Sequence, residues 1–248
     1  MTVTAPLPRS PALSPAGAGA SLTGREHVRL GRNNQDGFAL ARRGQAIAGV
    51  VTDGCSSSPR SEVGAQLSAR FLAGWVATHA AGAPLTEELG RIATDALCAW
   101  IYRAVSTLDG PPTAFVELVE TYFLHTFLCG VQIAGDALVF GIGDGAVLVD
   151  DALTRLDAGP RNAPPYAAYR LLTGRRPEPQ VHFLGRARRV VLMTDGFDAL
   201  LEKEPSRLAA LLDGELFRNA RTLQRRLNVL AEAAPPADDA TLVVLEGA

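Results

Sequence analysis

The order in which the hydrophobic period changes along the chain limits the folds that it can adopt. Apolar residues alternate with a period of two, as in strands, near the start and again past the middle, and a long helical pattern separates these regions. The expected strands are residues 21–22, 37–40, 45–52, 127–134, 137–142, 146–149, 190–194 and 240–245. Strands, a helix pair, strands, helices and a last strand are typical of an α+β sandwich, not of the βαβ units that build a parallel sheet.

Two long helices are expected between the two groups of strands. The first would begin with Ser61 as its cap, and the second would follow Thr86. Their buried stripes are predicted to be Val63, Leu67, Phe71 and Trp75 in the first helix, and Leu89, Ile92, Ala96, Trp100, Ala104 and Leu108 in the second. Shorter helical patterns cover residues 114–122, 206–212 and 215–233. We expect the two long helices to form an antiparallel pair on a sheet, and the strands between residues 127 and 149 to form a meander.

Length and composition favour one globular domain. The chain has 248 residues, of which 47% are hydrophobic, and its Pro- and Ala-rich residues 1–19 are expected to be a flexible leader before a single domain at 20–248. The formal net charge of −2 and the lack of a basic run argue against nucleic-acid binding. No segment is apolar over the roughly 20 residues of a membrane helix, so we expect no membrane partner and a cytoplasmic protein. The three cysteines lack metal-ligand spacing.

Four short acidic segments each adjoin an apolar run that is expected to be a strand. They are Asn34-Gln35-Asp36, Thr52-Asp53-Gly54, Thr194-Asp195-Gly196 and Asp238-Asp239-Ala240-Thr241. Carboxylates at strand ends can converge at one edge of a sheet although they are far apart in the sequence. Oxygen ligands of this kind suit Mg²⁺ or Mn²⁺, and two such ions can activate a water molecule for attack on phosphorus.

Six motifs, taken in order, resemble those of the metal-dependent protein phosphatase family, the protein phosphatase 2C type. They are residues 32–36 (RNNQD), 50–54 (VVTDG), 62–65 (EVGA), 141–144 (GIGD), 192–196 (LMTDG) and 238–244 (DDATLVV). The resemblance extends from about residue 21 to the C-terminus. It implies two antiparallel β-sheets in a sandwich, flanked by antiparallel helix pairs, with a two-metal centre in the cleft between the sheets.

The resemblance also implies a set of metal ligands. These are Asp36, Asp53, Gly54, Asp144, Asp195 and Asp238. Asp53 would bridge both ions and the Gly54 carbonyl would bind one of them, while Asp195 and Asp238 would complete the other. Asp36 would lie in the shell of bound waters or ligate directly, and Asp144 matches the position of a third, weaker ion.

The implied catalytic residues are Asp53, Asp195, Asp238 and Arg32. Arg32 is the candidate phosphate clamp, because a planar guanidinium can hold two phosphate oxygens at once. Its spacing to Asp36 is one residue shorter than the family pattern, so Arg29 is the alternative. The implied enzyme is a Mg²⁺- or Mn²⁺-dependent serine/threonine protein phosphatase that acts in signal transduction on a phosphorylated protein and opposes a serine/threonine kinase.

Several departures from the family pattern keep a second class of function open. Gln35 stands where the family often has glutamate, and Cys55 stands where some relatives place a histidine proposed as a general acid. The span between Asp150 and Thr194 is short for the flap that the family usually carries. The alternative is a pseudophosphatase, or a regulatory module that binds phosphoproteins on the same fold. A small-molecule phosphatase is a weaker option.

Single residues also have simpler interpretations. Asp144 could be an ordinary turn residue, and Asp239 could serve only to order the turn before the last strand. The chain has four histidines, and their spacing does not suggest metal binding: His27, His79, His125 and His182. We expect all four to be structural or solvated.

Overall fold

The structure is a computed structural model that describes residues 16–108, 111–159, 164–214, 216–219 and 221–247. Its strands form two sheets. The first, which we call the β3 sheet, has the order β2 (Gly37–Arg43), β3 (Ala46–Gly54), β4 (His125–Ile133), β5 (Asp136–Ile142) and β8 (Gln180–Arg186). The second, the β10 sheet, has the order β1 (Ala16–Leu22), β10 (Ala240–Glu246), β9 (Arg189–Met193), β6 (Gly145–Val149) and β7 (Ala152–Leu156). Neighbouring strands within the described residues pair antiparallel, which confirms the predicted α+β sandwich.

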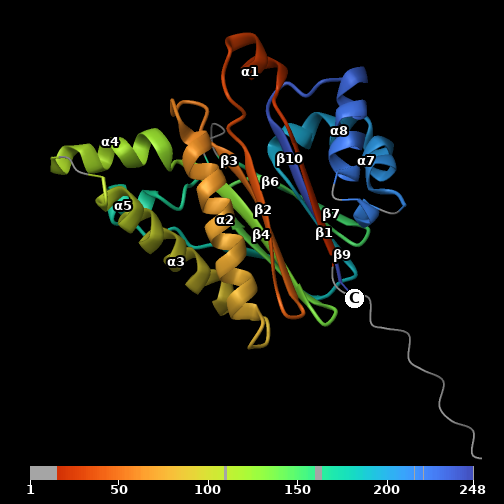
Figure 1. Cartoon of the computed structure of the whole chain (residues 1–248), viewed down its shortest axis with the longest axis horizontal. Helices are drawn as coiled ribbons and strands as arrows, with labels where there is room; N and C mark the ends of the chain where they lie inside the picture. Colours follow the sequence, from red (N-terminus) through yellow and green to blue (C-terminus); the bar gives the residue numbers. More distant parts are fainter. Residues whose placement is uncertain (1–15, 109–110, 160–163, 215, 220, 248) are drawn as a thin grey trace, which may run out of the picture.

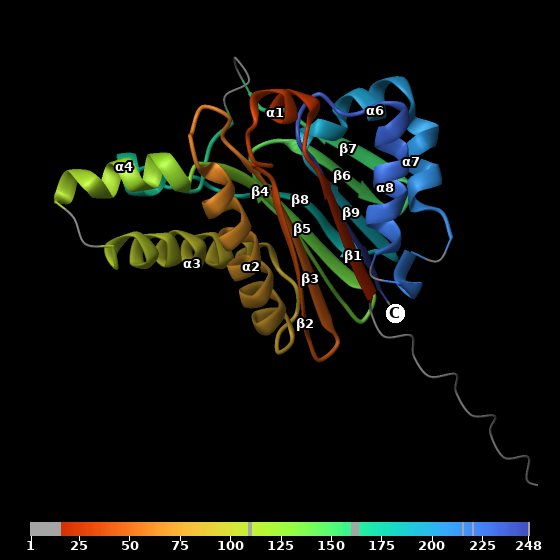
Figure 2. The ribbon, with the colours of Figure 1, turned by 45° about the horizontal axis from the view of Figure 1, so that its top comes forward.

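Helices cover the outer face of each sheet (Figure 1). The β3 sheet carries α2 (Ser61–Ala80), α3 (Glu87–Ser106), α4 (Pro112–Tyr122) and the short α5 (Tyr169–Thr173). The β10 sheet carries α6 (Asp198–Lys203), α7 (Pro205–Leu212) and α8 (Thr222–Ala233), with short 3₁₀ turns η2 (Asp195–Phe197) and η3 (Leu216–Arg218) (Figure 2). Helix α1 (Arg25–Leu30) lies at one end of the sandwich. No helix in the described ranges is long and apolar enough to cross a lipid bilayer.

The apolar residues of the central strands point alternately into different layers of the core. In β3, Val50 packs under the helices while Val51 packs between the two sheets. In β10, Val244 faces α7 and α8, and Val243 faces the β3 sheet. Successive side chains of a strand point to opposite faces, so a strand covered on both sides must be apolar at every position. This explains why these two segments read as continuous apolar runs.

The buried faces of α2 and α3 differ from the predicted stripes. Val63 and Leu67 are 41% and 42% exposed, and in α3 Ile92 is 43% exposed. The buried residues are instead Ser61, Glu62, Gly64, Ala65, Ser68, Ala69, Leu72, Ala73, Val76, Ala77 and Ala80 in α2, and Gly90, Ala93, Thr94, Leu97, Cys98, Ile101 and Val105 in α3. The predicted stripes were wrong only in part, because Phe71, Trp75, Leu89, Trp100 and Ala104 are partly buried and pack against the core. Small residues line the most deeply buried face, which allows the helices to lie close to the sheet and to one another.

Other elements begin or pair differently from the prediction. Strand β6 belongs to the β10 sheet, so the expected meander is limited to β4 and β5, and the chain crosses between sheets at the next turn. Ser61 is the first helical residue and not the cap, which is Arg60. Strand β1 begins at Ala16, so residues 16–19 are part of the sheet, whereas residues 1–15 lie outside the described residues. The sequence pattern did not indicate α1, α5, α6, β7 or β8.

Candidate metal centre

Antiparallel pairing brings the predicted acidic residues to one end of the sandwich. Strand β3 ends beside the start of β2, which brings Asp53 near Asp36. Strand β10 starts beside the end of β9, which brings Asp238 near Asp195. Asp144 lies in the turn where the chain passes from β5 to β6 and therefore from one sheet to the other. Adjacent strands run in opposite directions, so the end of one lies beside the beginning of the next.

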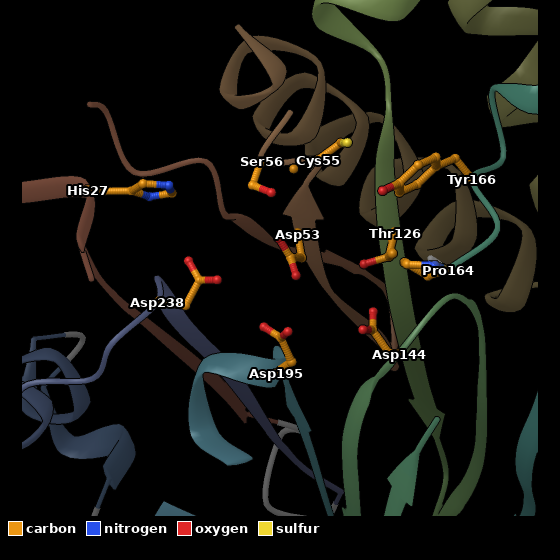
Figure 3. Close-up of a pocket in the computed structure, with 11 residues that line it drawn as sticks. His27, Asp53, Cys55, Ser56, Thr126, Asp144, Pro164, Tyr166, Asp195 and Asp238 are labelled. Carbon is orange, nitrogen blue, oxygen red and sulfur yellow. The ribbon is translucent and has the colours of Figure 1, made fainter. Parts of the chain in front are cut away.

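Four of these carboxylates line one pocket. Figure 3 shows Asp53, Asp144, Asp195 and Asp238 directed toward its centre. The remaining lining residues are His27, Gly54, Cys55, Ser56, Thr126, Pro164 and Tyr166. Asp53 is carried by the β3 sheet, and Asp195 and Asp238 by the loops at the ends of the β10 sheet. The pocket therefore lies where the two sheets meet.

Burial and mutual repulsion raise the pKa values of Asp53 and Asp195. Burial is the largest cause of the raised pKa of Asp53, followed by the charges of Asp36, Asp195, Asp144 and Asp238. The pKa of Asp195 rises to about 7, first through burial and then through the charges of Asp144 and Asp238. Burial also raises the pKa of Asp144. Without a compensating cation, these surroundings disfavour the ionised forms of the carboxyls.

Asp36 lies next to this group but outside the pocket. Its side chain is 3% exposed, and one carboxylate oxygen accepts a hydrogen bond of 2.8 Å from the Thr194 hydroxyl. Burial raises its pKa well above the ordinary value, although hydrogen bonds from Thr194 and Thr241 oppose this effect. Thr194 also accepts the Thr241 N–H at 2.9 Å. Asp36 thus joins β2 to the turn that carries Asp195.

The two adjacent carboxylates before β10 have different surroundings. Asp238 is exposed to the pocket, and one of its oxygens accepts the Asp239 N–H at 2.8 Å. Asp239 is 3% exposed and accepts the N–H groups of Gly24 at 2.7 Å and Gln35 at 2.6 Å. It also accepts a bond of 2.8 Å from Nδ1 of His27. The geometry therefore leaves Asp238 available to a ligand and occupies Asp239 in joining three loops.

His27 is a pocket residue that the sequence pattern did not identify. It lies in α1, is 6% exposed, and lines the pocket on the side of Asp238 (Figure 3). The prediction of a structural or solvated residue accounts for its bond to Asp239 but not for its place in the pocket wall. No local spacing could have indicated this position, because the residues around His27 come from the far end of the chain.

A segment between β7 and α5 forms the opposite wall. It contributes Pro164 and Tyr166, in the part of the chain that seemed too short for a flap. Burial raises the pKa of the Tyr166 hydroxyl, and its bond with the Cys55 thiol adds to this rise. Burial alone would raise the pKa of Cys55, but hydrogen bonds from Ser57 and Tyr166 outweigh it and lower that pKa. Cys55 is thus a half-buried wall residue with hydrogen-bond partners.

Neither candidate arginine lines the pocket. Arg32 is exposed, and its Nη1 donates a hydrogen bond of 3.1 Å to the carbonyl of Ser56, a lining residue. Arg29 pairs with Glu26 at 2.8 Å on the surface of α1. Arg32 is therefore attached to the rim of the pocket, whereas the side chain of Arg29 pairs with a residue of its own helix.

The donor set of the pocket fits a divalent cation. Carboxylates that converge, with pKa values raised by burial and by one another, are stabilised when a cation neutralises them. Oxygen-rich sites of this kind suit Mg²⁺ and Mn²⁺. At Gly54 a Cβ would come within 2.6 Å of the Ser61 hydroxyl oxygen, so the close packing of this turn requires a glycine.

Comparisons with known proteins identify the family and the fold. The sequence model for protein phosphatase 2C matches residues 23–234. The fold is similar to that of a bacterial serine phosphatase, with a TM-score of 0.60, 14% identity and coverage of 94% of this chain and 98% of that chain. It is also similar to the serine/threonine phosphatase Stp1 from Staphylococcus aureus (TM-score 0.60, 12% identity, 99% of both chains). The catalytic domain of the serine threonine protein phosphatase PstP, solved in complex with two manganese ions, gives a TM-score of 0.54 at 18% identity and covers 94% of this chain and 98% of its own. No curated protein matches at the sequence level.

Proposed function

This chain belongs to the protein phosphatase 2C family, and from that premise we propose that it is a Mg²⁺- or Mn²⁺-dependent serine/threonine protein phosphatase. The observation that carries the proposal is the convergence of four carboxylates from both sheets on one pocket. A phosphorylated protein would be the substrate, and a serine/threonine kinase would supply it. We further propose that the folded residues form one domain, which would bring both halves of the site into the same unit.

In this proposal the pocket carboxylates hold two divalent ions. Asp53 would bridge the ions, the Gly54 carbonyl would bind one, and Asp195 and Asp238 would hold the other. Asp144 would serve a third, weaker site. When bound, the ions would supply a water of lowered pKa as nucleophile and neutralise charge on the transferring phosphoryl group.

The other residues would position this machinery. Asp36 would act through Thr194, whose hydroxyl it accepts, and so fix the turn that carries Asp195. Arg32 would bind phosphate oxygens if its guanidinium broke the hydrogen bond to the Ser56 carbonyl and rotated toward the pocket. Arg29 has no contact with a lining residue among the described contacts, which favours Arg32 for this role.

A pseudophosphatase is the second candidate. It is favoured by the position of Arg32 outside the pocket and by Cys55, because a thiol is a poor substitute for an imidazole as a general acid. In that case the site would bind metal and phosphoprotein without turnover.

Steady-state kinetics on a phosphothreonine peptide and on para-nitrophenyl phosphate, with Mn²⁺ or with a chelator, would test the proposal. Asp195→Ala should lower kcat by a factor on the order of 10² or more. The variant would lose a metal ligand, and with it the ion that stabilises the charge of the transition state. Asp136→Ala, at the exposed first residue of β5 and away from the pocket, is the matched control and should retain activity. Arg32→Ala should mainly raise KM. Bound Mn²⁺ with no turnover of either substrate would favour the pseudophosphatase.

A further inference from the structure

Helix α1 is attached to the turn that carries Asp238 by several hydrogen bonds. The N–H groups of Arg25 and Glu26 donate to the carbonyls of Pro236 and Ala237 at 3.0 and 3.2 Å. Gly24 must lack a side chain here, because a Cβ would come within 2.2 Å of the Asp238 carbonyl carbon. The first turn of α1 and the turn before β10 therefore hold a fixed position relative to each other.

This attachment orients the imidazole of His27. Both oxygens of Asp239 are occupied, one by the Gly24 N–H and the other by the Gln35 N–H and Nδ1 of His27. Within the described part of the chain, Nε2 of His27 makes no hydrogen bond, although the side chain is only 6% exposed. Figure 3 shows the ring directed into the pocket on the side of Asp238.

A ring nitrogen of His27 and one carboxylate oxygen each of Asp238 and Asp239 lie within 4.8 Å of one another. Histidines that ligate metals usually donate their other ring N–H to a carboxylate, which fixes the tautomer and the direction of the lone pair. Asp239 has this relation to His27, and on the same side Asp238 has one carboxylate oxygen that does not accept the Asp239 N–H. The pair thus combines a fixed imidazole with an available carboxylate.

We propose that His27, through Nε2, is a nitrogen ligand of the divalent ion held by Asp238. This inference rests on the proposed function, since it assigns one more ligand to the same centre. Asp239 acts as a positioning residue that holds the ring. A purely structural role for His27 would be met by its bond to Asp239 and would not require the ring to line the pocket.

The proposal has a consequence for metal preference. Imidazole nitrogen suits transition metals, whereas Mg²⁺ prefers a shell of oxygen ligands. A centre with one imidazole should therefore favour Mn²⁺ over Mg²⁺ more strongly than a centre made only of oxygen ligands. Removal of His27 should weaken Mn²⁺ binding by at least about tenfold and Mg²⁺ binding by less.

Electron spin echo spectroscopy of the Mn²⁺-loaded full chain would test this directly. The wild-type protein should show a ¹⁴N modulation that changes when the protein is labelled with ¹⁵N-histidine. His27→Gln should lose the modulation, while His79→Gln, at an exposed site in the last turn of α2, should keep it. Calorimetric titration with Mn²⁺ and Mg²⁺ would give the two affinities.

The outcomes separate this inference from the proposed function. Bound Mn²⁺ without nitrogen modulation in the wild-type protein would overturn the ligand role of His27 and leave the proposed function standing. Failure of the wild-type protein to bind Mn²⁺ would overturn both. The wild-type measurement with labelled histidine does not depend on the folding of any variant, so it remains decisive if His27→Gln does not fold.

Discussion

Replacement of Asp195 by asparagine should stabilise the metal-free protein at alkaline pH. In the folded state, burial and the charges of Asp144 and Asp238 raise the pKa of Asp195 from 3.8 to about 7. Above that pH the wild-type protein must hold an ionised carboxylate in unfavourable surroundings. An amide of the same shape carries no charge, so the variant avoids this penalty.

The sign follows from proton linkage. A carboxyl with a higher pKa in the folded state binds its proton more tightly when folded, so its contribution to stability is complete below about pH 3.8 and is lost as the pH rises through about 7. The difference between these values corresponds to about 4 kcal/mol in the free energy of unfolding. The charges of Asp144 and Asp238 contribute to the shift, so part of the penalty depends on their ionisation. We therefore expect the substitution to raise the free energy of unfolding by about 2 to 4 kcal/mol at pH 8.5.

Urea unfolding in the presence of EDTA at pH 5 and pH 8.5 would measure this. The wild-type protein should lose stability between the two pH values, and Asp195→Asn should lose less. Addition of Mn²⁺ at 100 times its dissociation constant should stabilise the wild-type protein by about 2.7 kcal/mol and the variant by much less. Asp136→Asn, at the exposed first residue of β5, is the control and should follow the wild-type protein in every condition.

Two results would refute the reasoning. If Asp195→Asn were no more stable than the wild-type protein in EDTA at pH 8.5, Asp195 would not carry an unfavourable charge. If the variant kept the full response to Mn²⁺, the ion would be held elsewhere.

Two further predictions test the packing and the turn before β10. Leu192→Ala, between the sheets, should lower the free energy of unfolding by about 2 to 5 kcal/mol. Val63→Ala, on the exposed face of α2, should change it by less than about 0.5 kcal/mol. Equal losses of stability in urea unfolding would contradict the assignment of Val63 to the exposed face. Asp239→Asn should lower the melting temperature in EDTA, because an amide cannot replace both carboxylate oxygens as acceptors. Asp238→Asn should instead remove only the rise in melting temperature that a bound metal ion causes. The reverse result would show that Asp239 binds the metal ion and that Asp238 holds the turn together.

The sequence by itself determined the order of the longer strands and helices and the position of the acidic residues at their ends. Asp53 and Asp195 each follow an apolar run, and Asp238 precedes one, so their places at strand ends could be read locally. Antiparallel pairing then required these ends to meet at one end of the sandwich. The carboxylate pocket is therefore the feature best anticipated from the sequence.

Tertiary structure decided the phase of the helices and the sheet to which β6 belongs. A helical period fixes the spacing of apolar residues but not which stripe is buried when alanines compete with larger residues. In α2 the contact face is lined by small residues, and at Gly64 a Cβ would come within 1.8 Å of the Tyr122 carbonyl oxygen. Such close approaches depend on the partner element, which no local window contains.

The surroundings of His27 and Arg32 were decided in the same way. His27 enters the pocket because Asp239, from the other end of the chain, accepts the N–H at Nδ1 of its ring and the backbone N–H groups of Gly24 and Gln35. Arg32 stays at the rim because its guanidinium binds the Ser56 carbonyl. Both contacts join segments far apart in the sequence. Local pattern therefore predicts which residues end a strand, whereas the direction of each side chain depends on hydrogen-bond partners that only the folded chain brings close.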